Sequence, residues 1–143
     1  MSQENVEVVR ASIDGYNRGD WNALIKDAAA SFEFDFSRSV GPGRGVYSLD
    51  QLRGFFHEFV ESWESVRIEV DEFIEAGEHL VTPNTIYAQG RDGIEVQARG
   101  AFVWTIRDGS IARLCFYQER QEALEAMGLS EQDAHASRCH SQR

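Results

Sequence analysis

The stretch IEVQARGAFVWTIR, residues 94–107, decides the fold class of this chain. All of its even-numbered positions are apolar residues or glycine, and this period of two is typical of a β-strand with one buried face. Asp108-Gly109 follows directly, and this dipeptide between two apolar runs is a strong signal for a tight hairpin. We therefore expect residues 94–107 to pair with a following strand over residues 111–119.

The same period of two extends backwards from residue 94 to residue 66. Val66, Ile68 and Val70 begin one strand, and the turn at residues 75–78 leads into a second strand over residues 79–89. A further turn at Arg91-Asp92-Gly93 joins that strand to residues 94–107. The second half of the chain thus predicts an antiparallel meander of four strands.

The first half of the chain has mostly helical periodicity. Apolar residues three and four apart predict helices over residues 3–18 and 21–29 and a third helix that begins at Ser48. Phe32, Phe34 and Phe36 alternate with acidic residues, as in a half-buried strand, and residues 41–45 read as a loop. A last short helix is expected over residues 121–127. Helices that cover one face of a curved antiparallel sheet define an α+β class.

The composition excludes several classes of protein. The chain has 143 residues, of which 42% are hydrophobic, and a net charge of −10. This acidic balance argues against nucleic-acid binding, which needs a basic face, and against anionic membrane surfaces. No apolar run approaches the ~20 residues that span a bilayer, and the first residues are polar rather than typical of a signal peptide. We expect a cytoplasmic protein with no nucleic-acid or membrane partner.

The domain organisation is equally simple. Residues 1–128 carry the periodic segments without an internal repeat or a linker, so we expect one domain. Residues 129–143 are polar and aperiodic, and we expect a tail without fixed structure. The two cysteines lie in unlike contexts, a strand and this tail, which favours a reducing compartment without a disulfide.

Three segments carry a resemblance to a known family. They are Val9–Leu24, which contains Tyr16-Asn17-Arg18-Gly19-Asp20-Trp21, then Phe32–Gly45, and Ala101–Glu125. Together they resemble the nuclear transport factor 2-like superfamily, within it the SnoaL-like, ketosteroid isomerase-like branch. The resemblance implies a cone-shaped, barrel-like domain of cystatin-like fold, with three N-terminal helices packed on a curved antiparallel sheet. It also implies a pocket between these helices and the concave sheet face, and homodimers through the convex face.

The resemblance implies several chemistries, which the residues at the corresponding positions test. Steroid-type isomerisation needs a carboxylate base and two donors, and these positions fall at Phe34 or Asp35, near Ser12, and near Ala101 or Phe102. Two of the three roles are unfilled. The acid–arginine–acid site of limonene epoxide hydrolase-like enzymes would fall near Asn84, Ile86 and Phe116, and it is absent. A lone pocket carboxylate of the SnoaL-like cyclase kind fits best.

Asp35 is the leading candidate for that carboxylate. Strict alternation puts its side chain opposite Phe34, so an inward Asp35 requires a bulge near the glycine loop. In a pocket closed by aromatic residues, exclusion of water would raise its pKa. The alternative is that Asp35 caps the sheet edge or pairs with Arg38. Arg38 itself is either an anion clamp or a cation that orders the loop.

Other polar and aromatic residues have two interpretations each. His57, one position off the apolar stripe of the third helix, is a candidate base or a half-buried helix residue. Asn84 points where Ile86 points, and either orients a carbonyl or bonds to strand backbone. The candidate ligand-binding residues are Tyr16, Trp63, Asn84, Phe102, Trp104 and Phe116, which otherwise pack in the core. We expect no metal and no cofactor.

Two functions follow. The first is a pocket protein for a hydrophobic small molecule, which uses Asp35, His57 and Arg38 in an isomerase, cyclase or hydrolase reaction. The second is a non-catalytic dimeric module for binding or interaction, with its cavity filled by its own aromatic side chains. A cavity of at least ~300 Å³ with a buried carboxylate separates the two. The outward residues expected at the dimer interface are Arg99, Val103, Thr105, Arg113, Cys115 and Tyr117.

Overall fold

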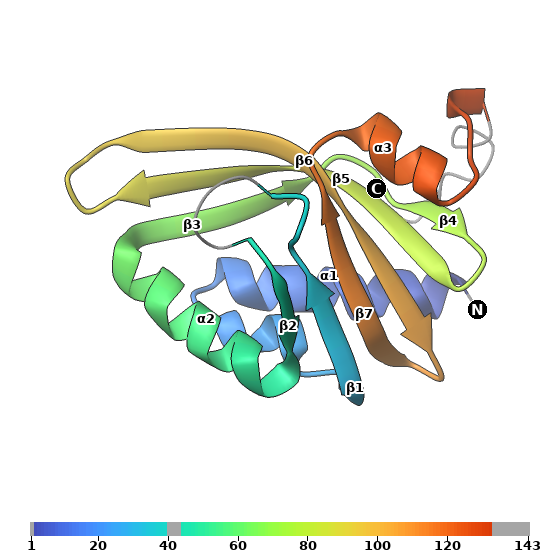
Figure 1. Ribbon diagram of the computed structural model, residues 1–143, viewed down its shortest axis with the longest axis horizontal. Coiled ribbons are helices and arrows are strands. Elements are labelled where there is room, and N and C mark those ends of the chain that lie inside the picture. The colour runs from blue at the N-terminus through green and yellow to red at the C-terminus, as the bar shows by residue number, and fades with distance from the viewer. Residues whose placement is uncertain (1, 40–43, 133–143) are drawn as a thin grey trace.

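A computed structural model describes residues 2–39 and 44–132. Its helices are α1 (Ser2–Asn17), the 3-10 helix η1 (Trp21–Ile25), α2 (Leu49–Ser62) and α3 (Arg120–Ala126). Its strands are β1 (Ala28–Asp35), β2 (Val46–Ser48), β3 (Trp63–Val70), β4 (Ile74–Ala76), β5 (His79–Gly90), β6 (Glu95–Arg107) and β7 (Ser110–Tyr117). Helices α1 and α2 cover one face of a curved sheet, and α3 lies on the other (Figure 1). The predicted α+β class is confirmed.

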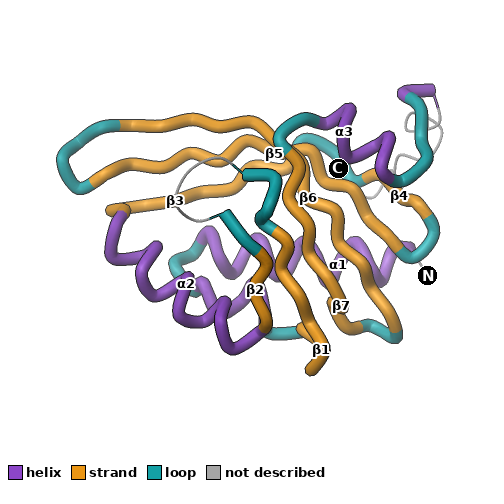
Figure 2. Tube along the Cα trace, viewed as in Figure 1, coloured by secondary structure: helices purple, strands orange, loops and turns teal. Residues whose placement is uncertain are grey.

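The sheet is mixed. Its strand order is β2-β1-β7-β6-β5-β3, with β4 paired to β5 beyond the end of β3 (Figure 2). Strands β5, β6 and β7 form the predicted antiparallel meander, which β3 joins by pairing with β5. Strand β1 pairs in parallel with β7, so that Phe34 faces Leu114 and Asp35 faces Cys115. This pairing links residues 80 or more positions apart in the sequence, which no local pattern reveals.

The junction between α1 and η1 is tightly packed. A side chain on Gly15 would place its Cβ 2.4 Å from the Cβ of Ala23, so only glycine allows this approach. The second helix is shorter than predicted. Residues 28–30 are alanines, which favour helix in isolation, but Ala28 pairs with Ile111 of β7 and the segment belongs to β1.

Two side-chain interactions fix the ends of the helices. Ser48 is the N-cap of α2 and forms a capping box with Gln51, in which each side chain bonds the other residue's backbone N–H. At the end of α1, Asn17 donates from Nδ2 to the carbonyl of Ile68 and accepts from the N–H of Ile68, both at 2.8 Å. These two bonds fasten α1 to β3.

Among the described residues, no helix is long and apolar enough to cross a membrane.

The core has two parts, one on each face of the sheet. The concave part lies between the sheet, α1, η1 and α2, and contains every phenylalanine that is buried among the described side chains. The convex part lies under α3, where Ala123 and Leu124 cover β6 and β7. Val103, Cys115 and Tyr117, which we expected on a dimer interface, are buried here by their own chain. They supply no exposed surface to a second copy, and the homodimer stays a prediction.

The end of the β5–β6 hairpin extends past both helical layers (Figure 1). Residues 91–99 are exposed on both faces, and Ile94 and Val96 are 61% and 43% exposed. Residues 95–107 form a strand, as the alternation predicted. The apolar residues of this strand are buried only from Gly100 onwards. At the other end of the domain, Leu129 packs against the convex core. Residues 133–143 of the expected tail, and residues 41–43 of the expected loop, lie outside the described residues.

Candidate functional site

A small apolar cavity lies inside the concave face. Its volume is about 70 Å³, well below the roughly 300–1,000 Å³ of typical ligand pockets. No charged side chain lines it. The lining residues come from α1, η1, α2 and five strands and are Tyr16, Leu24, Ile25, Phe34, Phe36, Leu52, Phe55, Phe56, Val66, Ile68, Ile86, Phe102, Trp104 and Leu114. The cavity thus fails both parts of the criterion for a carboxylate-dependent pocket.

Three of the candidate ligand-binding residues line this cavity, namely Tyr16, Phe102 and Trp104. Phe116 lies beside it, with its ring 5.4 Å from that of Phe102. Trp63 stands at the junction of α2 and β3 and is half-buried. Most of the other lining residues were not among our predicted site residues, although helical and strand periodicity predicted that they are buried.

Tyr16 contributes its side chain to the cavity wall. Its ring packs 6.3 Å from that of Phe56, and burial raises the pKa of its phenol to about 12. Like an ordinary phenol, it is protonated at neutral pH and is able to donate a hydrogen bond. The indole N–H of Trp104, by contrast, already donates to the hydroxyl of Thr82 at 2.9 Å. Trp104 offers a ligand only its aromatic surface.

The rim of the cavity near α2 is a cluster of aromatic rings. Phe36, Tyr47 and Phe55 are half-buried, and Phe55 lies 5.0 Å from Tyr47 and 6.0 Å from Phe36 between ring centres. Phe34, which is buried, contacts all three. Phe36 and Phe55 line the cavity and are half-buried, so they are the part of the wall with solvent on one side.

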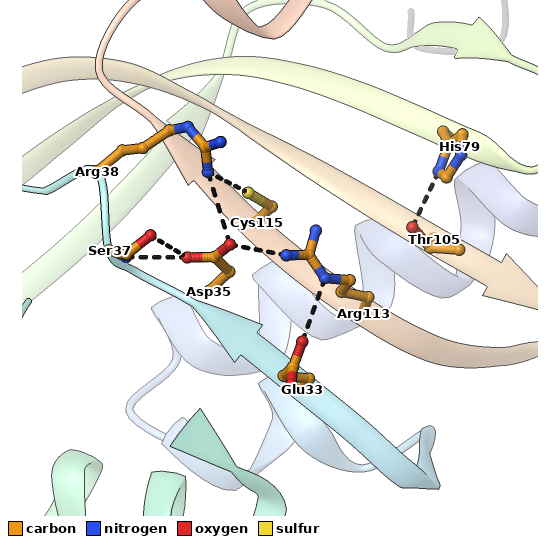
Figure 3. Close-up of polar contacts among 8 residues, drawn as sticks. All are labelled: Glu33, Asp35, Ser37, Arg38, His79, Thr105, Arg113 and Cys115. Carbon is orange, nitrogen blue, oxygen red and sulfur yellow. Dashed lines mark hydrogen bonds and ion pairs between the residues drawn. The ribbon is translucent and has the colours of Figure 1, made fainter. Parts of the chain in front are cut away.

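Asp35 lies on the opposite face of the sheet. Its carboxylate accepts a hydrogen bond from Nη2 of Arg113 at 2.7 Å and two from Ser37, through the backbone N–H at 3.0 Å and the hydroxyl at 2.5 Å (Figure 3). Nη1 of Arg38 lies 3.5 Å away. The strand is regular here, because the shift in register falls between Ala28 and Glu33. The expected bulge beside the glycine loop does not turn Asp35 inwards.

The electrostatics of Asp35 are the reverse of those expected for a pocket acid. Burial on its own raises the pKa of this carboxyl, but the bonds from Ser37 and the charges of Arg113 and Arg38 outweigh it. The pKa is lowered from its ordinary value, and the group is ionised at neutral pH. The expectation of a raised pKa is wrong, because the neighbours of Asp35 are cations rather than aromatic rings.

The two arginines complete a cluster on the convex face. Arg38 stacks over the ring of Tyr117. It also contacts the sulfur of Cys115 at 3.5 Å, and Arg113 pairs with Glu33 (Figure 3). Burial raises the pKa of the Cys115 thiol, so the sulfur is protonated and unreactive at neutral pH. Arg38 therefore orders this face and does not line the cavity.

The candidate base His57 also lies away from the cavity. It is exposed on the outer side of α2, where Nε2 is 3.4 Å from a carboxylate oxygen of Glu61. The structure thus places the three candidate catalytic residues, Asp35, Arg38 and His57, away from the candidate ligand-binding residues that line the cavity. Among the residues that the structure describes, no cluster of histidine, cysteine and carboxylate side chains is arranged to hold a metal ion.

Asn84 is the residue whose environment is least typical. It lies on β5 with 1% of its surface exposed, on the concave face that Ile86 shares. Neither Nδ2 nor Oδ1 has a hydrogen-bond partner within the described part of the chain. Strand alternation predicted its orientation, but the alternative that it bonds to strand backbone is wrong.

Comparison with known proteins assigns this fold to a family. Residues 9–114 match the family described as SnoaL-like domain, and the chain belongs to it. A search of curated proteins found no match.

Solved structures share the fold at low sequence identity. TerC co-crystallised with polyporic acid is 20% identical with a TM-score of 0.72, over 87% of this chain and 98% of that one. The Δ5-3-ketosteroid isomerase of Mycobacterium sp. is 16% identical with a TM-score of 0.69, over 80% and 92%. A putative polyketide cyclase of Xanthomonas campestris pv. campestris is 20% identical with a TM-score of 0.65, over 87% and 97%.

Proposed function

We propose that this SnoaL-like protein binds a small apolar ring compound in the cavity of its concave face. The observation that carries the proposal is the wall of that cavity, which consists of aromatic and aliphatic side chains around a space of about 70 Å³. Such a wall excludes ions and favours a flat apolar molecule through burial of its surface. Asp35, Arg38 and His57 take no part in this binding.

The size of the ligand follows from the volume. A space of about 70 Å³ is smaller than the roughly 150 Å³ apolar cavity that accommodates benzene in an engineered protein. A single ring therefore enters only when part of the wall moves. The half-buried rings of Phe36 and Phe55, which line the cavity, are the part that moves.

The test uses fluorobenzene, whose binding is followed by ¹⁹F NMR in sealed tubes. We expect saturable binding of one molecule per chain. Ile86→Phe fills the cavity and abolishes binding, whereas Ile94→Phe makes the same change on the exposed hairpin and leaves binding intact. Binding that is absent from the wild type, or that survives Ile86→Phe, refutes the proposal.

A second candidate is proton-transfer catalysis on a bound cyclic ketone, of the isomerase or cyclase type. The observation that favours it is the phenol of Tyr16, a residue of the cavity wall, which is a hydrogen-bond donor at neutral pH. A phenol bonded to a ketone oxygen stabilises the enolate that forms when a base from the solvent removes the neighbouring α-proton.

The test of this candidate is exchange of the α-hydrogens of cyclohexanone in D₂O, followed by ¹H NMR. Catalysis requires the wild type to exchange them faster than buffer, and Tyr16→Phe to slow the reaction on the order of 10²-fold. Exchange at the buffer rate excludes this candidate and leaves ligand binding as the function.

A further inference from the structure

A buried amide with both of its polar atoms unpartnered lies beside the cavity. Asn84 is 1% exposed, and neither Nδ2 nor Oδ1 has a hydrogen-bond partner among the described residues. Burying such groups costs free energy, because both lose their hydrogen bonds to water and gain none in return. Most buried side-chain amides in folded proteins have partners, so this exception needs a physical reason.

The neighbours of Asn84 place it at the cavity. On the concave face Asn84 lies opposite Val70 of β3 and Gly100 of β6. Its next neighbours on that face are Ile68, Ile86 and Phe102, and all three line the cavity. Side chains in such diagonal positions of a sheet are within reach of each other. Asn84 itself is not among the lining residues, but it lies next to these three.

The side of Asn84 that faces β6 is closed by an aromatic ring. Gly100 has no side chain, and a Cβ there would lie 2.7 Å from Cε1 of Phe116. The ring of Phe116 thus occupies the space over Gly100, and Val70 closes the opposite side. Both of these neighbours are apolar and supply no hydrogen bond to Asn84.

We infer that Asn84 is the specificity-determining residue of this cavity and recognises a hydroxyl or carbonyl oxygen on an otherwise apolar ring compound. The inference rests on the proposed binding function. Nδ2 donates to the ligand oxygen, and when that oxygen belongs to a hydroxyl group its hydrogen is donated to Oδ1. A hydroxylated ring satisfies both atoms, a ketone only one, and a hydrocarbon neither.

The experiment compares two probes that differ by one hydroxyl group, fluorobenzene and 3-fluorophenol, by ¹⁹F NMR titration. We expect the wild type to bind 3-fluorophenol about tenfold more tightly, the effect of about one net hydrogen bond. In Asn84→Leu, which keeps the size and removes the amide, we expect both probes to bind as weakly as fluorobenzene does to the wild type.

Two further variants make the comparison specific. Thr105→Val removes a buried hydroxyl on the opposite face, where Thr105 contacts Nδ1 of His79, and it should keep the tenfold preference. Asn84→Thr keeps one hydrogen-bonding group and should show an intermediate preference. It also replaces Asn84→Leu in the comparison if that variant does not fold.

The outcomes separate this inference from the function on which it rests. If neither probe binds the wild type, the proposed function is refuted. If both bind equally, or if Asn84→Leu keeps the tenfold preference, the cavity binds rings but Asn84 does not select them. A preference that persists in Asn84→Leu and disappears in Tyr16→Phe assigns the selection to the phenol and overturns the role of Asn84.

Discussion

Nη2 of Arg113 lies 2.7 Å from Oδ2 of Asp35, across the parallel pairing of β1 with β7. The two residues are 78 positions apart in the sequence, so this ion pair ties the first strand of the chain to its last. Phe34, one position before Asp35, lines the cavity on the other face. One face of β1 thus lines the cavity through Phe34, and the other face is held to β7 by the ion pair of Asp35 with Arg113.

This relationship predicts a loss of stability in Asp35→Asn. At pH 7 we expect the free energy of unfolding to fall by about 1–3 kcal/mol, since hydrogen bonds to a charged group are lost. Solvent screens the pair in part, because both arginines are more than 40% exposed.

The pH dependence of this loss follows from the lowered pKa of Asp35. A carboxyl whose pKa is lower in the folded state stabilises the protein above its unfolded pKa, near 3.9, and loses that effect as the pH falls through its folded value. The difference between wild type and Asp35→Asn should therefore be large at pH 7 and small at pH 2. Urea unfolding at both pH values measures it, with the exposed Asp50→Asn as control. An equal difference at the two pH values contradicts the prediction.

A pair of substitutions on β5 compares an unpartnered polar group with a partnered one. Asn84→Leu should leave the free energy of unfolding unchanged or raise it, because two unpaired polar atoms are removed. Thr82→Val should lower it by about 1–3 kcal/mol, because the buried indole N–H of Trp104 loses its acceptor. Chemical denaturation of both variants checks this, and a marked destabilisation by Asn84→Leu argues that the amide has a partner.

Substitution of glycine by alanine should have opposite effects on stability at two positions. A Cβ on Gly100 would meet Phe116 at 2.7 Å and the carbonyl of Tyr117 at 2.9 Å, so Gly100→Ala should destabilise by about 1–3 kcal/mol. Gly54 lies inside α2 with nothing within 4 Å, and Gly54→Ala should stabilise by about 0.5–1 kcal/mol. Thermal unfolding should shift in opposite directions, and a neutral Gly100→Ala would show that the Phe116 ring is free to move.

The phenol of Tyr16 predicts an alkaline weakening of the fold. Its pKa is about 12 in the folded protein and 10 in an unfolded chain, so the folded state holds the proton more tightly. The stability is fully present below pH 10 and falls above it, by up to about 1.4 kcal/mol per pH unit. Urea unfolding at pH 9 and pH 11 should show a smaller loss for Tyr16→Phe than for the wild type, and identical losses count against the buried phenol.

The alternation of residues 32–36 shows how far the sequence determines the site. Phe32, Phe34 and Phe36 predicted a strand with an aromatic face, and the structure has that strand and that face. The same rule put Asp35 on the other face, and the structure agrees. The bulge invoked to bring Asp35 inwards was wrong, because Arg113 and Ser37 hold its carboxylate where the regular strand puts it.

Other features depend on partners far away in the sequence. Arg113 looked like an exposed residue of an outer face until β1 and β7 were paired. The alanines at 28–30 favour helix locally, and pairing with β7 overrides that preference. The alternation of side chains along β5 predicted that Asn84 lies on the same face as Ile86. The lack of a partner for Asn84 depends on Val70, Gly100 and the ring of Phe116, which come from three other strands.

The contact between Asn17 and Ile68 has a consequence for the open side of the sheet. Strand β3 is an edge strand, and the free N–H and C=O groups of an edge can pair with another chain. Asn17 occupies both groups of Ile68, in the interior of β3, with the donor and acceptor that a neighbouring strand would present. Asn17 therefore also blocks the addition of another strand at this point of β3, and with it edge-to-edge aggregation.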